Sequence, residues 1–306
     1  MSQLMDEALE KYREAGKITA SVMRKAKKLV SKGRKLITIC DSLEKEIRNA
    51  GAQPAFPVNV SVNQIAAHYT SPFGDDLKIP ERAIVKIDLG AHVDGYISDQ
   101  AKTFLVGGTK KYQLLRQTSE LALENAISFI KPGIRPGDIG EVIEKTIRKE
   151  GLVPITDLTG HVIDRWKLHT GTSIPNYKPK FNFLEPKLKV GQVLAVEPFV
   201  TTEDGSEKIY DESYSFIFSQ IGDKAKSADS KILLNEIKKY YRLPFAIRWL
   251  EESLPETKLY EALKELISFK TINRYPMLVS KSQTPIAQSE HTVIITEHGC
   301  EVITRI

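Results

Sequence analysis

Two aspartates near the middle of the chain have a spacing that could hold metal ions. Asp88 lies in a short β-branched segment, and Asp99 lies in a second strand-like segment after the turn signal Asp94-Gly95. If the turn is centred between Val93 and Asp94, the two carboxylates face each other with Cβ atoms about 4.5–5.5 Å apart. Because buried like charges repel, this register predicts cations between them, as in a two-metal site. The spacing alone also fits a solvated hairpin with two exposed aspartates.

Three further residues interrupt apolar patterns and extend this candidate site. Glu197 and Glu290 each lie within an otherwise apolar strand pattern, and His161 follows a strand-like segment and a glycine. A buried acid normally needs a partner or a metal ion, although each of these acids alone could be a charge at the edge of a strand. As a set, four carboxylates and one imidazole suit Mn²⁺, Fe²⁺, Co²⁺ or Zn²⁺.

The elements that must position these residues are helices followed by strands. Helical apolar spacing is found in residues 3–50 and 110–130. Strand-like segments precede His68 and His161, and buried-strand patterns occupy residues 193–199 and 286–295. In the last of these, alternation predicts one shared face for Gln288, Glu290 and Thr292.

Two segments one hundred residues apart align without gaps. Residues 33–54 match residues 133–154, and the identical pairs include Gly33/Gly133, Glu44/Glu144, Gly51/Gly151 and Pro54/Pro154. Coincidence can also produce similar amphipathic helices. If the repeat is real, two related helix-plus-strand halves form an α+β fold, with sheets packed together and helices outside. A site is then expected where the halves meet.

The composition argues against several classes of protein. The 306 residues are 41% hydrophobic and 27% charged, which is ordinary for a globular chain that buries a sizeable core. The net charge of +5 is too small to argue for nucleic-acid binding. Cys40 and Cys300 have no metal-binding spacing and favour a reducing cytosol. No apolar run is long enough to span a membrane.

Residues 205–275 differ in character from the rest of the chain. Within them, residues 231–269 are rich in Lys and Glu and have helical spacing, with breaks at Pro244 and Pro255. We therefore expect a single catalytic domain over residues 1–306 that contains an inserted helical subdomain at about residues 205–275. This insertion carries no chemistry that its residue types reveal.

Five ordered segments resemble the type 2 methionine aminopeptidases, and the resemblance covers essentially the whole chain. The segments are FPVNVSVNQIAAHYTSP, KIDLGAHVDGYISDQAKTF, GHVIDRWKLHTGTSIP, VLAVEPF and AQSEHTVII. The resemblance includes the helical insertion between the last two segments and a start at the catalytic domain, as in archaeal members. It implies the pseudo-two-fold "pita-bread" fold. It also implies co-translational removal of the initiator methionine by dinuclear-metal-dependent hydrolysis, with a preference for a small second residue.

The resemblance assigns metal ligands residue by residue. Asp88 would bind one ion in bidentate fashion, Asp99 and Glu290 would bridge two ions, and His161 and Glu197 would complete the other ion. The resemblance thus implies two divalent ions per chain, of Co, Mn, Fe or Zn. The hydroxide held between them would attack the carbonyl of the first residue.

Other residues would act on the substrate. Glu197 would carry a proton from water to the leaving amine, and His68 and His169 would position the scissile amide or the developing oxyanion. The apolar methionine pocket would be formed by Phe56, Leu168 and Tyr275. Four further residues are expected to serve the turn or the packing and not catalysis: Asp94, His92, His291 and His298.

The expected partners and location follow from the same resemblance. The substrates would be nascent polypeptide N-termini, and association with the ribosome is left open. No membrane and no specific nucleic acid are expected to bind, and the chain would be a cytoplasmic monomer. The departures from the family pattern are small: Ser289 replaces a large apolar residue, and the run after Glu197 is unusual. Both concern the pocket wall and the insertion.

Two alternatives remain at the level of the sequence. One is a pita-bread protein that has lost catalysis and binds RNA or protein. All five ligand positions hold competent side chains, however, and no strong basic patch is evident. The other is a proline-specific relative, prolidase or aminopeptidase P, which shares the ligands. Those enzymes usually carry an extra N-terminal domain, for which the roughly fifty residues before the first repeat strand leave no room.

Overall fold

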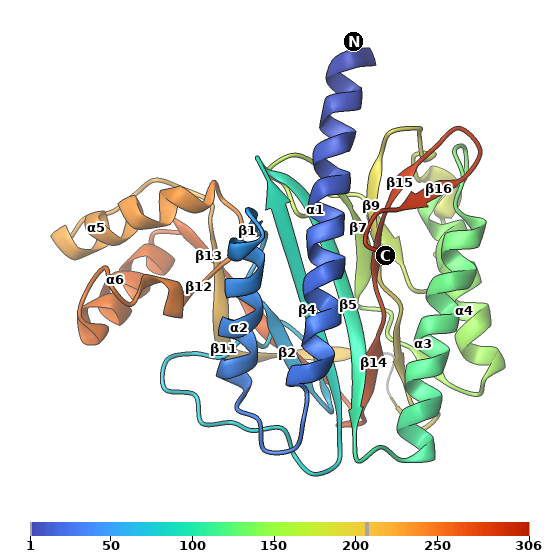
Figure 1. Ribbon diagram of the computed structural model, residues 1–306, viewed down its shortest axis with the longest axis horizontal. Helices are drawn as coiled ribbons and strands as arrows, with labels where there is room; N and C mark the ends of the chain where they lie inside the picture. Colours follow the sequence, from blue (N-terminus) through green and yellow to red (C-terminus); the bar gives the residue numbers. More distant parts are fainter. Residues whose placement is uncertain (1, 206–207, 306) are drawn as a thin grey trace.

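The central hairpin of the protein is formed by β4 (Ala83–Val93) and β5 (Tyr96–Val106). The computed structural model describes residues 2–205 and 208–305 (Figure 1). Val93 pairs with Tyr96 across the two-residue turn Asp94-Gly95. Both turn residues have positive φ, 51° and 85°, which is the conformation that a type I′ hairpin turn requires.

This register corrects the predicted pairing of the two aspartates. Asp88 lies opposite Ala101, and Asp99 lies opposite Gly90. The turn lies one residue later than predicted, which displaces the pairing by two positions. The shift of two keeps both carboxylates on one face of the sheet as diagonal neighbours, with a backbone separation of about 7–8 Å. The prediction of directly opposed carboxylates is therefore wrong, while the shared face is retained.

The internal repeat is visible in the structure. Helices α2 (Leu36–Asn49) and α4 (Pro136–Lys149) are equal in length and lie one hundred residues apart. Each is followed by a left-handed glycine, Gly51 or Gly151, and then by a short strand, β1 (Gln53–Pro54) or β6 (Val153–Pro154). Only a residue without a Cβ adopts this φ at little cost, so the identical glycines mark the two helix ends.

The strands of the two halves pair in the same way. In the first half, β1 and β2 (Asn59–Val62) both pair with β4. In the second half, β7 (Thr159–Ile163) pairs with β9 (Val193–Val196), and β6 pairs with β10 (Phe199–Thr201). The remaining strands of the second half are β8 (Ser173–Pro175), β14 (Ile286–Gln288), β15 (His291–Ile295) and β16 (Cys300–Val302). They complete sheets of order β14-β10-β6 and β16-β15-β9-β7-β8.

Helices cover the outer faces of these sheets (Figure 1). Helices α1 (Ser2–Leu29) and α2 pack on the first half, and α3 (Lys110–Phe129) and α4 pack on the second half. Two separate buried clusters result. One includes Met23, Leu43 and Ile87, and the other includes Ala122, Ile143 and Leu194. Burial of these apolar faces holds the helices outside, as the periodicity predicts.

The inserted segment begins and ends with strands. The strand β11 (Ile209–Gln220) pairs antiparallel with β13 (Ile272–Ser280), which also pairs with β3 (Ile65–Ala67). A short strand, β12 (Phe245–Ala246), borders β11. The sequence predicts helices throughout this segment, whereas residues of β11 form a strand. They do so because β11 pairs with β13, which itself pairs with β3 of the first half.

Helices occupy the middle of this segment. They are α5 (Ala228–Ile237) and α6 (Glu256–Ser268), with 3₁₀ turns η2 (Lys238–Tyr240) and η3 (Ile247–Leu250) between them. A further 3₁₀ turn, η1 (Asn182–Leu184), lies in the second half. Figure 1 shows α5 and α6 as a separate lobe beside α2. Over residues 2–205 and 208–305, no helix is long and apolar enough to cross a membrane.

Candidate metal centre and substrate pocket

The first two acids of the candidate centre are held by the central hairpin. Asp88 and Asp99 project from β4 and β5, and each interacts with the other's carboxyl group. Thr292 of β15 fixes Asp99 through its hydroxyl, which accepts from the Asp99 N–H and donates to the Asp99 carbonyl, both at 2.7 Å. The hairpin of the first half is thereby joined to the sheet of the second half.

The other two acids lie where strands are interrupted. Glu197 lies with Pro198 between β9 and β10, where proline cannot donate a ladder hydrogen bond. Glu290 follows Ser289 between β14 and β15. The flanking pairs, Val196 with His291 and Phe199 with Gln288, bracket both glutamates. The two interruptions therefore lie at the same level, and the two glutamates lie across from each other.

His161 approaches the acids from β7. Its Nε2 lies 3.7 Å from Asp99 Oδ2 and 3.7 Å from Glu197 Oε1. The imidazole is buried, and its ring centroid lies 4.3 Å from that of His169 in an edge-to-face arrangement. The structure thus brings together all five residues for which a metal role was predicted.

The donor set fits a metal ion. Possible ligand atoms of Asp99, His161 and Glu290 all lie within 4.8 Å of one another. Buried polar atoms without a hydrogen-bond partner occur at four of the five positions: Asp88 Oδ1, Asp99 Oδ1, His161 Nδ1 and Glu290 Oε1. Such orphaned atoms are rare in native interiors, and oxygen atoms with one imidazole suit first-row divalent ions.

The electrostatics of the cluster point the same way. Burial raises the pKa of Asp88 to about 7. Burial, and then the charges of neighbouring acids, raise the pKa of Asp99 and Glu290 well above the usual range, and burial and Asp88 do the same for Glu197. Burial lowers the pKa of His161 well below its usual value. A cation among these groups would favour the ionised carboxylates and the neutral imidazole.

The predicted substrate residues lie around this cluster. Phe56 packs against the hairpin at Gly90. A Cβ added to Gly90 would lie only 2.6 Å from Cε1 of Phe56. Leu168 belongs to the same buried apolar cluster as Phe56. Tyr275 lies edge-to-face against His68, with ring centroids 5.6 Å apart.

The two predicted substrate histidines differ in exposure: His68 is half-buried, and His169 is exposed. His68 has φ of 64°, and its Nδ1 lies 3.1 Å from the carbonyl oxygen of Pro276. Burial lowers the pKa of His68. Although His169 is exposed, the crowding of its ring by neighbouring groups, and then the charge of His68, lower the pKa of His169. Both imidazoles are therefore neutral near pH 7 and can donate or accept one hydrogen bond at each ring nitrogen.

The residues predicted to have no catalytic role lie away from the cluster or face elsewhere. His92 lies at the hairpin tip against Trp166, and Asp94 forms an exposed ion pair with Lys11. The Nδ1 atom of His291 lies 2.8 Å from Thr304 Oγ1. Their non-catalytic interpretation stays a prediction.

Two residues near the site were not assigned a role from the sequence. The Nε2 atom of Gln288 lies 3.4 Å from an oxygen of Glu197 and of Glu290, so its amide can hold both carboxylates. The alternation of the sequence, which places Gln288 on the same strand face as Glu290, could have indicated this role. Leu243 of the inserted segment packs in the apolar cluster with Phe56 and Leu168. No local pattern could have shown that contact, because it joins distant segments.

A large cavity lies elsewhere in the molecule. It measures about 1260 Å³ and is bounded by α2, the tip of the central hairpin and the inserted segment. Its lining includes Arg48, Trp166, Tyr241 and Arg248, and none of the five clustered metal-site residues. We therefore place the candidate site at the carboxylate cluster, on its chemistry and not on cavity size.

Comparison with known proteins identifies the family. The sequence pattern of metallopeptidase family M24 matches residues 10–297. The chain belongs to this family. The methionine aminopeptidase of Methanothermobacter thermautotrophicus is 43% identical over 304 residues, which cover 98% of this chain and all of that relative. The methionine aminopeptidase of Thermococcus onnurineus is 42% identical, with 98% and 100% coverage.

Solved structures show the same fold. The methionine aminopeptidase of Thermotoga maritima has a TM-score of 0.73 at 25% identity, over 98% of this chain and 97% of that chain. A thermophilic Arx1 has a TM-score of 0.85 at 20% identity, over 98% and 91%. A prolidase from Pyrococcus furiosus has a TM-score of 0.61 at 19% identity, over 98% and 64%. At these lower identities the last two show the fold alone.

These comparisons decide several sequence predictions. The resemblance to methionine aminopeptidases, the α+β pita-bread fold and the enzyme class, a metallopeptidase and thus a hydrolase, are confirmed. The near-complete match to methionine aminopeptidases supports the predicted function, and the two alternatives are not favoured. The individual site roles stay predictions.

Proposed function

We propose that this chain is a methionine aminopeptidase that removes the initiator methionine from nascent proteins and prefers a small second residue. The observation that carries the proposal is the buried Asp99–His161–Glu290 group in a chain whose relatives are methionine aminopeptidases over their whole length. A buried carboxylate-rich site with one imidazole fits a metal-dependent hydrolase.

The ligand set would hold two divalent ions, of Co, Mn, Fe or Zn. Asp88 and Asp99 of the first half and His161, Glu197 and Glu290 of the second half would hold these ions. When bound, the ions supply a hydroxide nucleophile near neutral pH and Lewis acidity at the scissile carbonyl. The four acids that crowd the cluster support this assignment, because their mutual repulsion is relieved by cations.

The chain's own groups would carry the remaining steps. Glu197 would take a proton from water and deliver it to the leaving amine. His68 and His169 would donate hydrogen bonds to the scissile amide or the developing oxyanion from neutral imidazoles. Phe56, Leu168 and Tyr275 would form the apolar wall around the methionine side chain.

We extend the proposal to partners, location and domain organisation. The substrates would be free N-termini of nascent chains, met near the ribosome by a monomeric protein in the cytoplasm. The two free cysteines, Cys40 and Cys300, support a reducing compartment. Residues 205–275 would form an inserted subdomain within a single catalytic domain, which the separate apolar cluster around Leu233, Phe245 and Leu263 supports.

The test is release of free methionine from a Met-Ala-Ser peptide. Chelator-stripped protein would be assayed with and without added Co²⁺ or Mn²⁺, and release is expected only with metal. Two matched peptides are the controls: the same sequence with a blocked N-terminus, and a Xaa-Pro peptide. Neither is expected to be cleaved.

Each contrary outcome has a distinct meaning. Cleavage of the Xaa-Pro peptide alone would assign the chain to the proline-specific relatives. No cleavage with either metal would contradict the proposal and favour a binding protein. Cleavage of the blocked peptide would show that the free amine is not required.

A further inference from the structure

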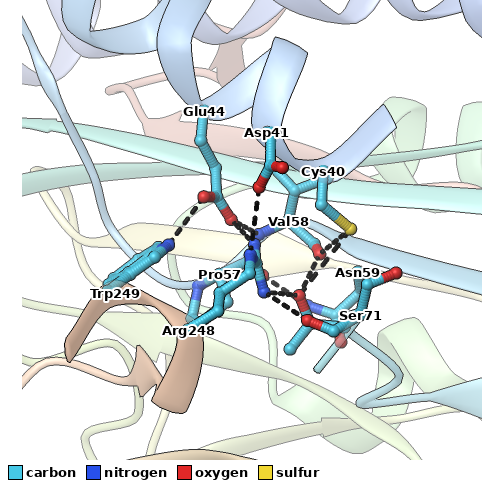
Figure 2. Close-up of polar contacts among 10 residues, drawn as sticks. Cys40, Asp41, Glu44, Pro57, Val58, Asn59, Ser71, Arg248 and Trp249 are labelled. Carbon is cyan, nitrogen blue, oxygen red and sulfur yellow. Dashed lines mark hydrogen bonds and ion pairs between the residues drawn. The ribbon is translucent and has the colours of Figure 1, made fainter. Parts of the chain in front are cut away.

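A buried arginine joins the inserted segment to the first half of the fold. Arg248 lies in η3, and its side chain is 5% exposed. Figure 2 shows it pointing toward Glu44 and Asp41. Its Nη1 donates to Thr70 Oγ1 at 2.7 Å and to the Ser71 carbonyl at 3.1 Å. Its Nη2 donates to the carboxylate of Glu44 on α2, and its Nε lies 3.3 Å from Asp41 Oδ1.

Glu44 is the centre of the same network. Its side chain is 2% exposed, and it receives three donors. Besides Arg248, these are the indole N–H of Trp249 at 2.6 Å and the backbone N–H of Val58 at 3.1 Å. A buried carboxylate with three donors is fully satisfied, so the pair is well defined in geometry and costly to break.

The network fixes the two segments that carry predicted substrate residues. Glu44 binds the N–H of Val58, and Thr70 Oγ1 donates to the Val58 carbonyl at 2.8 Å. Phe56 lies two residues before Val58, and His68 lies two residues before Thr70. One guanidinium and one carboxylate therefore hold both segments, although neither touches the carboxylate cluster.

The inserted segment also holds His68 from the other side. The Nδ1 atom of His68 lies 3.1 Å from the Pro276 carbonyl of β13, and Tyr275 packs against its ring. The segment between Phe56 and His68 is thus fixed by two separate parts of the insertion.

The corresponding glutamate of the second half has different partners. Glu144 is identical to Glu44 in the internal repeat, but it pairs with Arg148 of its own helix and with the backbone N–H of Lys178. Its side chain is 26% exposed. Among the residues that the structure describes, the helix glutamate bound to an arginine from the insertion is Glu44, in the half that carries Phe56 and His68.

We propose that Arg248 and Glu44 are positioning residues that determine selectivity for methionine. They fix Phe56 and His68 relative to the hairpin, so that the insertion sets the width of the substrate pocket. The proposal rests on the proposed aminopeptidase function and adds a role for the insertion to it.

The test compares Arg248→Lys and Trp249→Phe with the wild-type protein. Lysine keeps the charge but loses the planar fork, and phenylalanine removes one donor to Glu44 while keeping the ring. The readout is the ratio of kcat/KM for Met-Ala-Ser over Leu-Ala-Ser. Because both peptides are assayed on one preparation, the ratio does not depend on how much protein is folded.

We expect the ratio to fall by about fivefold or more in Arg248→Lys, and by less in Trp249→Phe. A fall of this size lies within the discrimination between apolar side chains that the shape of a pocket can provide. Arg13→Lys is the matched control, because Arg13 forms a bidentate pair with Glu301 between α1 and β16. In that variant the ratio is expected to stay unchanged.

Three outcomes would overturn the inference. An unchanged ratio in Arg248→Lys and Trp249→Phe, with native near-UV circular dichroism, would leave the network a purely structural role. An equal fall in Arg13→Lys would make the effect general. No methionine release by the wild-type protein would overturn the proposed function, and this inference with it.

Discussion

At the scale of single residues, the crowding of carboxylates dominates the candidate site. Asp88, Asp99, Glu197 and Glu290 are gathered where burial opposes their ionisation. Among the described residues, His161 is the basic side chain that lies within ion-pair distance of these acids, and its own pKa is lowered. Bound cations would therefore relieve the repulsion among these carboxylates, and without cations the cluster destabilises the native state. Single substitutions of these acids test both effects.

Glu197→Gln is expected to reduce methionine release by about 100-fold or more. The amide keeps the size of the side chain but cannot take up a proton from water. The measurement is kcat with saturating metal, with far-UV circular dichroism to establish that the fold is intact. Glu144→Gln, an equally conservative change on α4, should leave the rate unchanged. A fully active Glu197→Gln protein would exclude Glu197 as the proton carrier.

Asp88 gives a pH dependence with a definite sign. Its pKa is raised by burial from 3.8 to about 7 in the native metal-free protein, so the native state binds the proton more tightly than the unfolded state. This contribution to the free energy of unfolding is present below about pH 4 and is lost as the pH rises through about 7. In Asp88→Asn the side chain is neutral throughout, so the loss should be absent.

The measurement is urea unfolding of chelated protein at about pH 5 and about pH 8. The wild-type protein should lose more than about 1 kcal/mol relative to Asp88→Asn between these values. Asp94→Asn is the control, because Asp94 is exposed at the hairpin tip. Parallel pH curves for the wild-type and Asp88→Asn proteins would contradict the raised pKa.

At the scale of secondary-structure elements, close backbone approaches position the side chains of the site. The turn at Asp94-Gly95 sets the register of β4 and β5, and therefore which face carries Asp88 and Asp99. A slip of one residue would place an aspartate on the opposite face. Interruptions at Glu197-Pro198 and Ser289-Glu290 then bring two further acids to the same level.

Gly90→Ala should disturb this packing. A Cβ at Gly90 would lie 2.6 Å from both Phe56 Cε1 and the Ser98 carbonyl oxygen, and the latter belongs to the paired strand. The free energy of unfolding is expected to fall by about 1–3 kcal/mol, and KM for a Met-Ala-Ser peptide should rise as Phe56 moves. Urea unfolding and steady-state kinetics measure the two effects.

Gly299→Ala is the matched control for this substitution. The nearest atom to its added Cβ is the Ile130 carbonyl oxygen at 3.8 Å, an ordinary contact. It should change neither stability nor KM appreciably. If Gly90→Ala behaves like Gly299→Ala, Phe56 is not held against the hairpin as described.

At the scale of the whole molecule, the site lies where the two related halves meet. The first half supplies Asp88 and Asp99, and the second half supplies His161, Glu197 and Glu290. The hydrogen bonds between Thr292 and Asp99 join the halves directly. Ions bound between the halves would therefore link them and stabilise the native fold as a unit.

Removal of metal should lower the stability of the whole chain. Added Mn²⁺ or Co²⁺ at about 100 times its dissociation constant is expected to stabilise the chelated protein by about 2.7 kcal/mol for each ion bound only to the native state. Thermal unfolding measures this shift. Asp99→Asn should lose most of it, whereas an equal shift in Asp99→Asn would show that the ions bind elsewhere.

The sequence by itself determined the local elements and the identity of the acids in the site. Apolar periodicity predicts α2, α3 and α4, because one face of each helix must be buried. The repeat predicts two related halves, because identical glycines end α2 and α4. Acids within apolar strands predict a buried charged site, since such residues are unfavourable without a partner.

Tertiary structure decided what depends on contacts between distant segments. The register of the central hairpin differs from the prediction, because the conformation of the turn residues and not their position alone sets the pairing. The strand β11 was not predicted, since only its pairing with β13 makes it a strand. Gln288 contacts Glu197, which is distant along the chain, and Glu290, which lies beyond the end of its strand. Arg248 likewise contacts Glu44, which is distant along the chain. Their geometry exists only when the chain has folded, because no local preference encodes it.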